Sequence, residues 1–241
     1  MLNPVNYART LMDDFRCFRE RSSSKYILDH LRCGPYLLMR RHTNDRQVVR
    51  TVFLHDAYGI GWLGHLLHFK DLDDKSVLDI GAHIGCFTVA ALYGNACRVV
   101  AYEPSPESVR LLQANLALAR CGLKALPPVD VIQAAVAGET GTASLHTSSR
   151  FPTGDSLDGR EDHDGSKEVM TVAASDVLKE RFDFMKCDCE GAERYIIPLL
   201  PDSRVEEFVM ELHGSQDTSP LSMEFSLRYD ERMRILRGVR R

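Results

Sequence analysis

The sequence predicts an α/β fold in which helices cover both faces of a doubly wound, mostly parallel sheet. Two observations carry this prediction. From residue 75 onward, short apolar runs alternate with helical patterns. In addition, the run at 76–80 is joined to the helical pattern at 84–93 by a turn that contains two glycines. Strands that alternate with helices in this way build parallel sheets.

Each later segment extends the alternation. Ser105, Pro106 and Glu107 predict the start of a helix with Ser105 as its cap, and Gly122 predicts its end. Val109, Leu112, Leu116 and Ala119 are expected to form its buried stripe. Further strands are expected at 97–103, 129–137, 142–147, 168–173, 182–187 and 205–212. A short helix capped by Ser175 is also expected, and a helix over 189–200 that bends or ends near Pro198.

The first part of the chain follows another pattern. Two helical patterns occupy 5–33, with Leu11, Phe15 and Phe18 at helical spacing, and strand-like runs at 35–42 and 47–56 predict a hairpin. A helix is expected over 59–71. We therefore expect helices and a hairpin over 1–57, packed on a single domain over 58–241.

Composition excludes several classes of protein. The 241 residues carry a net charge of −4, which disfavours a strongly basic nucleic-acid binder. No apolar run reaches the roughly 20 residues of a membrane helix, and the N-terminus lacks the apolar core of a signal peptide. Seven scattered cysteines indicate reduced thiols. We expect a cytoplasmic protein that does not bind membranes.

The glycine turn predicts a cofactor site. Gly81 allows a sharp turn at the strand end and Gly85 allows a close approach to the main chain. Glu103 ends the next strand, where an acid accepts hydrogen bonds from ribose hydroxyls. His83 replaces the middle glycine of a dinucleotide fingerprint, and Asp79 would repel a pyrophosphate. These residues favour S-adenosylmethionine (SAM), a cation without phosphate.

Four blocks of sequence, in matching order and spacing, resemble the FkbM family of methyltransferases. They are VLDIGAHIGCFT, AYEPSPESVRLLQANLAL, AVAGETGTASLH with the strand before it, and FDFMKCDCEGAERYIIPLL. The resemblance covers about residues 50–214 and is most specific in the last block. It implies a class I SAM-methyltransferase (Rossmann-like) fold and O-methylation of a hydroxyl on a sugar, glycan or secondary metabolite.

The resemblance also implies site residues. The methionine end of SAM would lie at the turn that follows Asp79, the ribose at Glu103, and the methyl group near Asp188. The positions expected to hold SAM are Asp79, Gly81, Ala82, His83, Gly85, Glu103, Pro104, Ser105, Gln133, Ala134 and Asp188. The chain departs from the family at His83, where asparagine is common. Its short C-terminus also leaves little sequence for the last two strands of the sheet, so the sheet is either incomplete or completed by a partner, such as a second copy of the chain.

Three residues at strand ends are candidates for catalysis. Asp188, Glu190 and His213 qualify as a general base or as ligands of the acceptor, because they follow strands expected to be neighbours in the sheet. The rival interpretations are a helix-start acid for Glu190 and a strand-end histidine bonded to a loop for His213. Glu193 is expected only to start the helix, and Lys186 to pair with an acid. The same three residues offer ligands for a divalent metal, which the sequence does not require.

The sequence leaves the acceptor open. A small molecule or glycan with a free hydroxyl is the leading expectation, and the loop over 148–166, with Tyr58 and Trp62, is a candidate lid over it. Two rival functions remain. An RNA methyltransferase would need a basic groove, and a protein that binds SAM without chemistry would tolerate changes at Asp188 or His213.

Overall fold

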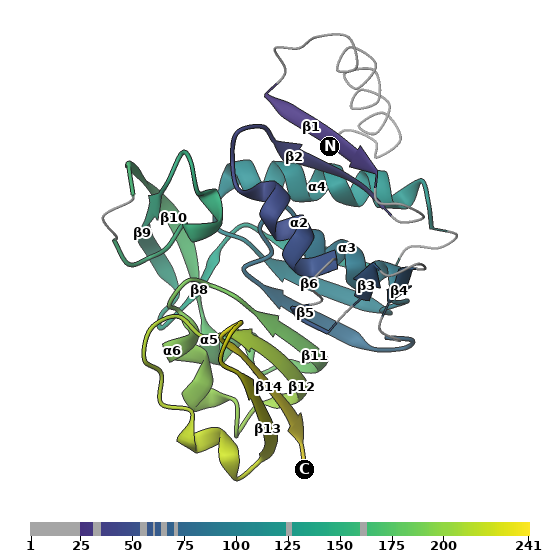
Figure 1. The fold of residues 1–241 in the computed structure, drawn as a ribbon. Helices are drawn as coiled ribbons and strands as arrows, with labels where there is room; N and C mark the ends of the chain where they lie inside the picture. The colour runs from purple at the N-terminus through teal and green to yellow at the C-terminus, as the bar shows by residue number, and fades with distance from the viewer. Residues whose placement is uncertain are drawn as a thin grey trace.

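The computed structural model describes residues 25–30, 35–53, 57–59, 61–63, 67–69, 72–123, 127–159 and 163–241 (Figure 1). Within these residues, a seven-stranded sheet forms the centre of the molecule, with strand order β13-β14-β12-β11-β5-β6-β7. Its strands are β5 (Ser76–Ile80), β6 (Arg98–Tyr102), β7 (Val129–Ile132), β11 (Arg181–Cys187), β12 (Arg204–Glu211), β13 (Phe225–Asp230) and β14 (Ile235–Arg240).

Strand direction confirms the doubly wound sheet. β7, β6, β5, β11 and β12 are parallel neighbours, and β14 lies antiparallel between β12 and β13. The expectation that the C-terminus is too short for the last two strands is wrong. Residues 225–240 build both strands as one hairpin, which requires far less chain than a crossover with a helix. The chain therefore completes this sheet by itself.

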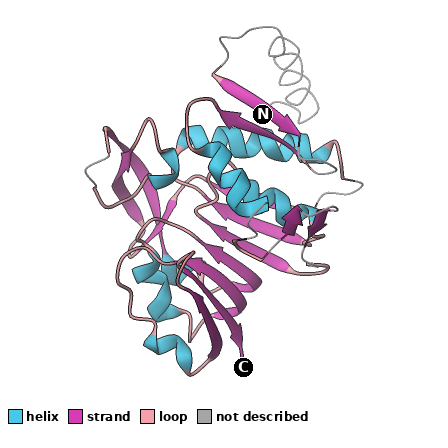
Figure 2. Cartoon of the chain, viewed as in Figure 1, coloured by secondary structure: helices cyan, strands magenta, loops and turns pink. Residues whose placement is uncertain are grey.

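Two apolar cores lie on opposite faces of the sheet, because successive residues of a strand point to opposite faces. Val77 and Val99 belong to one core, while their neighbours Leu78 and Val100 belong to the other. The first core is covered by α2 (Asp45–Phe53), α3 (Cys86–Tyr93) and α4 (Pro106–Arg120). The second is covered by α5 (Ala174–Val177), α6 (Glu193–Ile196) and the 3₁₀ turn Ile197–Leu199 (Figure 2).

The helix boundaries refine the expected ones. The stripe of Val109, Leu112, Leu116 and Ala119 in α4 is buried as predicted, and Gly122 lies just beyond its end. The side chains of Ser105 and Ser175 make no capping bond, since Ser105 contacts Glu107 and Ser175 lies inside α5. The helix expected over 189–200 is one short turn that passes into a 3₁₀ turn at Pro198.

No described helix has the length and apolar character that crossing a bilayer requires.

The strand expected over 129–137 is divided between two sheets. Its first half is β7 of the central sheet, and its second half, β8 (Ala135–Ala137), lies in a small sheet of order β8-β10-β9. The other members are β9 (Gly141–Thr147) and β10 (Gly165–Ala173), which pair antiparallel. Gln133 and Ala134 therefore lie where the chain leaves the central sheet.

The hairpin expected over 35–56 is wrong in its second strand. β2 (Tyr36–Arg40) pairs with β1 (Tyr26–His30), which takes the place of the end of the second helical pattern, while the run at 47–56 begins within α2. Val49, Val52 and Phe53 are buried at helical spacing, so packing on α3 decides the conformation. Leu11, Phe15 and Phe18 lie outside the described residues.

The helix expected over 59–71 is also wrong. The described parts of this segment form two short antiparallel strands, β3 (Gly61–Leu63) and β4 (Leu67–Phe69). Three glycines between 59 and 64 lower the helix propensity of the segment, which explains the error. Earlier in the chain, β2 packs on α4, where Asn115 bonds the backbone of Leu38 through both its oxygen and its amide nitrogen. The boundary expected at residue 57 stays a prediction.

Candidate active site

A cavity opens at the carboxyl ends of β5, β6 and β11, the edge at which ligands bind in open α/β sheets. It encloses about 820 Å³, including its open mouth. The predicted site residues that line it are Gly81, Ala82, His83, Glu103, Pro104, Ala134, Asp188 and Glu190. Asp79, Gly85, Ser105, Gln133 and His213 lie outside the lining.

The charges that line the cavity are mostly negative. Four carboxylates, from Glu103, Asp155, Asp188 and Glu190, face one lysine, Lys186. A pyrophosphate would meet repulsion here, whereas a sulfonium and an ammonium would meet favourable charges. The cavity therefore fits the cationic cofactor that the sequence favours.

Gly81 allows the turn after β5 to lie directly against the chain that follows β11. Its φ is +76°, and a Cβ atom built at this position would stand 1.8 Å from the backbone oxygen of Asp188. Only glycine tolerates both conditions. The amides of Gly81 and Ala82 both donate to the oxygen of Tyr102, which fixes the turn to the end of β6.

Gly85 makes the second close approach. Its φ is +85°, and an added Cβ would lie 2.9 Å from the side chain of Leu112 in α4. Gly85 immediately precedes α3. It therefore brings α3 and α4 together behind the turn.

Asp79 lies behind the turn rather than at its surface. Its carboxylate is fully buried, accepts a bond of 2.6 Å from the Thr88 hydroxyl, and lies 3.3 Å from Lys186 Nζ. Lys186 Nζ in turn donates to the oxygen of Gly81 at 2.5 Å. Burial opposes the charge on this lysine, but Asp79 and Asp188 raise the pKa of Lys186 above its usual value. The expected pairing of Lys186 with an acid is confirmed, and direct contact between Asp79 and a cofactor stays a prediction.

Glu103 is held by two backbone amides. Its carboxylate oxygens accept from the amides of His83 at 2.7 Å and Ser105 at 2.8 Å. Burial raises the pKa of Glu103 to about 7, although both hydrogen bonds oppose the rise. The acid is thus fixed in position at the cavity wall with a pKa near neutrality.

His83 connects the turn to the N-terminal segment. Its Nε2 atom lies 2.6 Å from an Arg40 amino group, and Arg40 pairs with the buried carboxylate of Asp45. Burial and then the charge of Arg40 lower the pKa of His83 to about 3, so the ring is neutral and accepts at Nε2. Sequence reasoning missed Arg40 and Asp45, because they lie more than thirty residues before the turn and belong to no motif.

Asp188 stands at the other side of the cavity. The Tyr58 hydroxyl donates to its Oδ2 atom at 2.7 Å, and Lys186 Nζ lies 4.0 Å from the same oxygen. Tyr58 is buried, and Lys186 Nζ also lies 5.5 Å from the centre of its ring. Tyr58 therefore orients the carboxylate from a segment far away in sequence.

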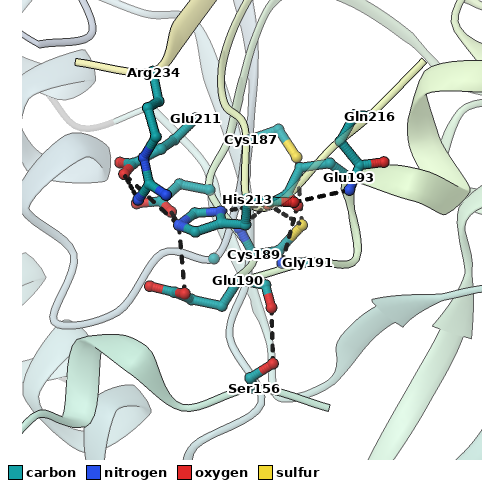
Figure 3. Close-up of polar contacts among 12 residues, drawn as sticks. Ser156, Cys187, Cys189, Glu190, Gly191, Glu193, Glu211, His213, Gln216 and Arg234 are labelled. Atoms are coloured by element: carbon teal, nitrogen blue, oxygen red, sulfur yellow. Dashed lines mark hydrogen bonds and ion pairs between the residues drawn. The ribbon is translucent and has the colours of Figure 1, made fainter. Parts of the chain in front are cut away.

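His213 gathers the carboxylates beside this cavity (Figure 3). Its Nδ1 atom lies 3.1 Å from Glu193, and its Nε2 atom lies 3.4 Å from Glu190, 3.7 Å from Glu211 and 4.0 Å from Asp188. Burial alone would lower the pKa of His213, but Glu193 and the other carboxylates raise it to about 9. The structure thus brings the three candidates Asp188, Glu190 and His213 together.

Glu193 and Glu211 were not expected in the site. Glu193 is fully buried and accepts from the amides of Cys189 and Gly191, so it closes the turn after β11 and contacts His213. Burial, then Asp188, raises the pKa of Glu211 to about 7. The period-two pattern could have indicated Glu211, because it lies two residues before His213. Glu193 also qualified by its position after the strand, but its place in the first turn of a helix favoured the structural interpretation.

The loop expected to form a lid reaches the cavity. Pro152, Thr153, Asp155, Ser156 and Leu157 line it, and the Ser156 hydroxyl donates to the backbone oxygen of Glu190 at 2.7 Å. The side chain of Trp62 lies outside the described residues. The described part of the loop therefore lines the cavity beside Glu190, while closure over an acceptor stays a prediction.

Comparisons with known proteins give a family and a set of distant folds. The family profile described as methyltransferase FkbM domain matches residues 79–228. No curated protein matches the chain.

Among solved structures, a SAM-dependent methyltransferase from Agrobacterium tumefaciens is 13% identical over 85% of this chain and 57% of its own, with a TM-score of 0.45. A protein from Pyrococcus horikoshii described as an RNA methyltransferase is 15% identical over 70% and 76%, with a TM-score of 0.38. The structure of aTrm5 with tRNALeu is 12% identical over 90% and 53%, with a TM-score of 0.39.

Proposed function

The chain belongs to the FkbM methyltransferase domain family, and we propose on this premise that it methylates a hydroxyl of a small molecule or glycan. The observation that carries the proposal is the group of acids beside the cavity. Asp188 and Glu190 line it, and His213 lies next to both. A hydroxyl acceptor must lose a proton, and carboxylates placed at the reacting edge are suited to receive it.

The turn after β5 and Glu103 are the residues proposed to hold SAM, which supplies an electrophilic methyl group on a sulfonium. In methyl transfer the acceptor oxygen would replace the sulfur on the methyl carbon, and the hydroxyl proton would pass to the protein. Holding the hydroxyl in line with the methyl group is worth up to about 7–11 kcal/mol in well-oriented systems. A general base adds about 10²–10⁴-fold.

Glu190 is proposed as the proton acceptor. Its carboxylate is at the cavity wall, and its backbone is held by Ser156 with φ at +54°. Asp188 already accepts the Tyr58 hydroxyl at Oδ2, so we assign it to orienting the acceptor. His213 does not line the cavity and is proposed to position Glu190 through the 3.4 Å contact.

Methyl transfer from labelled SAM to a panel of hydroxylated sugars and metabolites tests this function. We expect the Glu190→Gln variant to lose about 10²–10⁴-fold in kcat with SAM affinity unchanged. The matched control is Glu168→Gln, an exposed acid on β10. Full activity of Glu190→Gln would contradict its role. Methyl transfer to RNA in place of hydroxylated small molecules would contradict the acceptor class, and SAM binding without turnover of any acceptor would contradict catalysis.

A further inference from the structure

We infer that Asp188, Glu211 and His213 form a site for a divalent cation of the Mn²⁺ or Mg²⁺ class at the acceptor side of the cavity. Asp188 immediately follows β11, Glu211 is the last residue of β12, and His213 lies two residues further. The two strands are parallel neighbours, with Cys187 opposite Met210. The fold thus delivers all three side chains to one point, where one ligand atom of each lies within 4.8 Å of the others.

The orientation of His213 is set by a buried carboxylate. Glu193 accepts from the backbone amides of Cys189 and Gly191, and Nδ1 of His213 lies 3.1 Å from the same carboxylate. Nδ1 therefore keeps its proton toward Glu193 when a metal ion displaces the proton of Nε2, and Nε2 is directed to the other acids (Figure 3). A carboxylate behind a histidine in this manner is the usual arrangement around metal-binding imidazoles.

The carboxylates that face Nε2 of His213 require a positive charge among them. Nε2 lies 3.7 Å from Glu211 Oε1 and 4.0 Å from Asp188 Oδ1, too far for hydrogen bonds. Glu190 Oε2 lies 3.4 Å away on the same side. A lone pair that faces three carboxylates is repulsive unless a proton or a metal ion lies among them.

The spacing suits a small divalent ion. Ligand atoms about 2.1 Å from an octahedral ion stand roughly 3 Å apart when adjacent and roughly 4 Å apart when opposite. The observed separations of 3.7 and 4.0 Å, both measured from Nε2 of His213, exceed the spacing of adjacent ligands by less than about 1 Å, so small side-chain movements would bring the three ligand atoms onto one ion. Two carboxylates and one imidazole are ligands that these metals accept. Tyr58 bonds Oδ2 of Asp188, which leaves Oδ1 as the ligand atom on the side of His213.

Neighbouring cations do not occupy the same point. Arg234 lies 3.4 Å from Glu211 but its side chain is 54% exposed, and Lys186 lies 4.0 Å from Oδ2 of Asp188, on the side of Tyr58. A metal ion here would polarise an acceptor oxygen and make its proton more acidic. That chemical role rests on the proposed function, whereas the binding of the ion does not.

Titration of the EDTA-treated full chain with Mn²⁺, followed by the loss of the free-ion electron paramagnetic resonance signal, tests the site without an acceptor. We expect saturable binding of one Mn²⁺ that is lost in His213→Ala and in Glu211→Gln. Glu193→Gln should weaken it by about 10–100-fold, because the ring loses its orienting carboxylate. The matched control, Glu206→Gln on the same strand, should bind like the wild type.

SAM affinity of each variant, measured in parallel, reports whether the fold is retained. Absence of Mn²⁺ binding at millimolar concentration, with SAM binding intact, would overturn the inference and leave a proton on His213 as the occupant. Equal Mn²⁺ affinity in wild type, His213→Ala and Glu211→Gln would also overturn it. Mn²⁺ binding in a protein that methylates no hydroxyl would support the site and contradict the proposed function. Methyl transfer that survives EDTA treatment, in a protein that binds no Mn²⁺, would contradict the metal site and support the proposed function.

Discussion

The two sides of the cavity are built by different means. On the side proposed to hold the cofactor, backbone groups fix the structure: the turn at Gly81 is bonded to the end of β6, and Glu103 is fixed by two amides. On the side proposed to hold the acceptor, side chains from distant segments converge, with Tyr58 on Asp188 and Glu193 on His213. A short stretch of sequence therefore suffices to specify the first side, whereas the second depends on strand register.

Lys186 joins the two sides. Its ammonium lies 3.3 Å from Asp79 behind the turn and 4.0 Å from Asp188 at the acceptor side. Substitutions at Gly81 or Lys186 should therefore impair both sides. A substitution at Glu103 should impair only the cofactor side, and one at Ser156 only the acceptor side.

The largest effect is expected from Gly81→Ala. A Cβ at 1.8 Å from the oxygen of Asp188 forces the turn and the end of β11 apart, and the positive φ adds strain of about 1–3 kcal/mol. We expect loss of SAM binding and a marked fall in the urea midpoint of unfolding. Gly59→Ala is the control, since it has a φ of +64° but only an ordinary contact at 3.8 Å. Equal stability of the two variants would show that close packing at Gly81 is unimportant.

Lys186→Met should rank second. It leaves the buried carboxylate of Asp79 without its cation, and breaking a buried pair in this way costs about 3–5 kcal/mol of unfolding free energy. Lys179→Met removes an ion pair between two exposed side chains and should leave the urea midpoint unchanged. A Lys186 variant as stable as the Lys179 variant would contradict the bridging role.

Glu103→Gln should affect the cofactor side alone. The pKa of Glu103 is about 7, and its ionised form is the one that accepts hydrogen bonds from the ribose hydroxyls. The affinity of the wild type for SAM should therefore fall as the pH drops through 7, by up to about tenfold per pH unit. The variant should bind SAM weakly and without this pH dependence.

The sign for stability is opposite. The pKa of Glu103 in the folded chain is raised above its ordinary value, so its neutral form favours folding at low pH, and that contribution disappears as the pH rises through about 7. Calorimetric SAM titrations between pH 5.5 and 8.5 and unfolding curves at both ends check the two signs. Parallel pH profiles for wild type and variant would exclude Glu103 as the titrating group.

The smallest effect is expected from Ser156→Ala on the acceptor side. It removes the 2.7 Å bond to the backbone oxygen of Glu190, and a bond of this kind is worth about 0.5–1.5 kcal/mol. We expect the KM for the acceptor to rise by about two- to tenfold while SAM affinity stays constant. Ser149→Ala is the control in the same loop, because its exposed hydroxyl bonds Asp164 instead. A larger loss of SAM affinity than of acceptor affinity would place the loop on the cofactor side.

The difference between the two sides of the cavity also explains which elements the sequence predicted. The strand, glycine turn and helix from Ser76 to Tyr93 are local, and their periodicity identified them correctly. The alternation of strands and helices also predicted β6, α4, β11 and β12. By contrast, the contacts of Arg40 with His83 and of Glu193 with His213 are tertiary contacts that no spacing in the sequence encodes.

The errors have a physical cause as well. The run at 47–56 is apolar enough for a strand, but its valines also fit the face of a helix, and burial against α3 selects that helix. The last two strands were left open because little sequence remains for them, and the hairpin they form needs less chain than a crossover with a helix. Short apolar runs are ambiguous until their partners are known.

Calorimetric titration of the purified protein with SAM and, separately, with NAD is the most direct test of the central claim, that the backbone-built side of the cavity binds a cationic nucleoside. We predict micromolar binding of SAM alone, weakened in Glu103→Ala and retained in Glu190→Gln. Binding of NAD without SAM would contradict it, and so would SAM binding that survives Glu103→Ala but fails in Glu190→Gln.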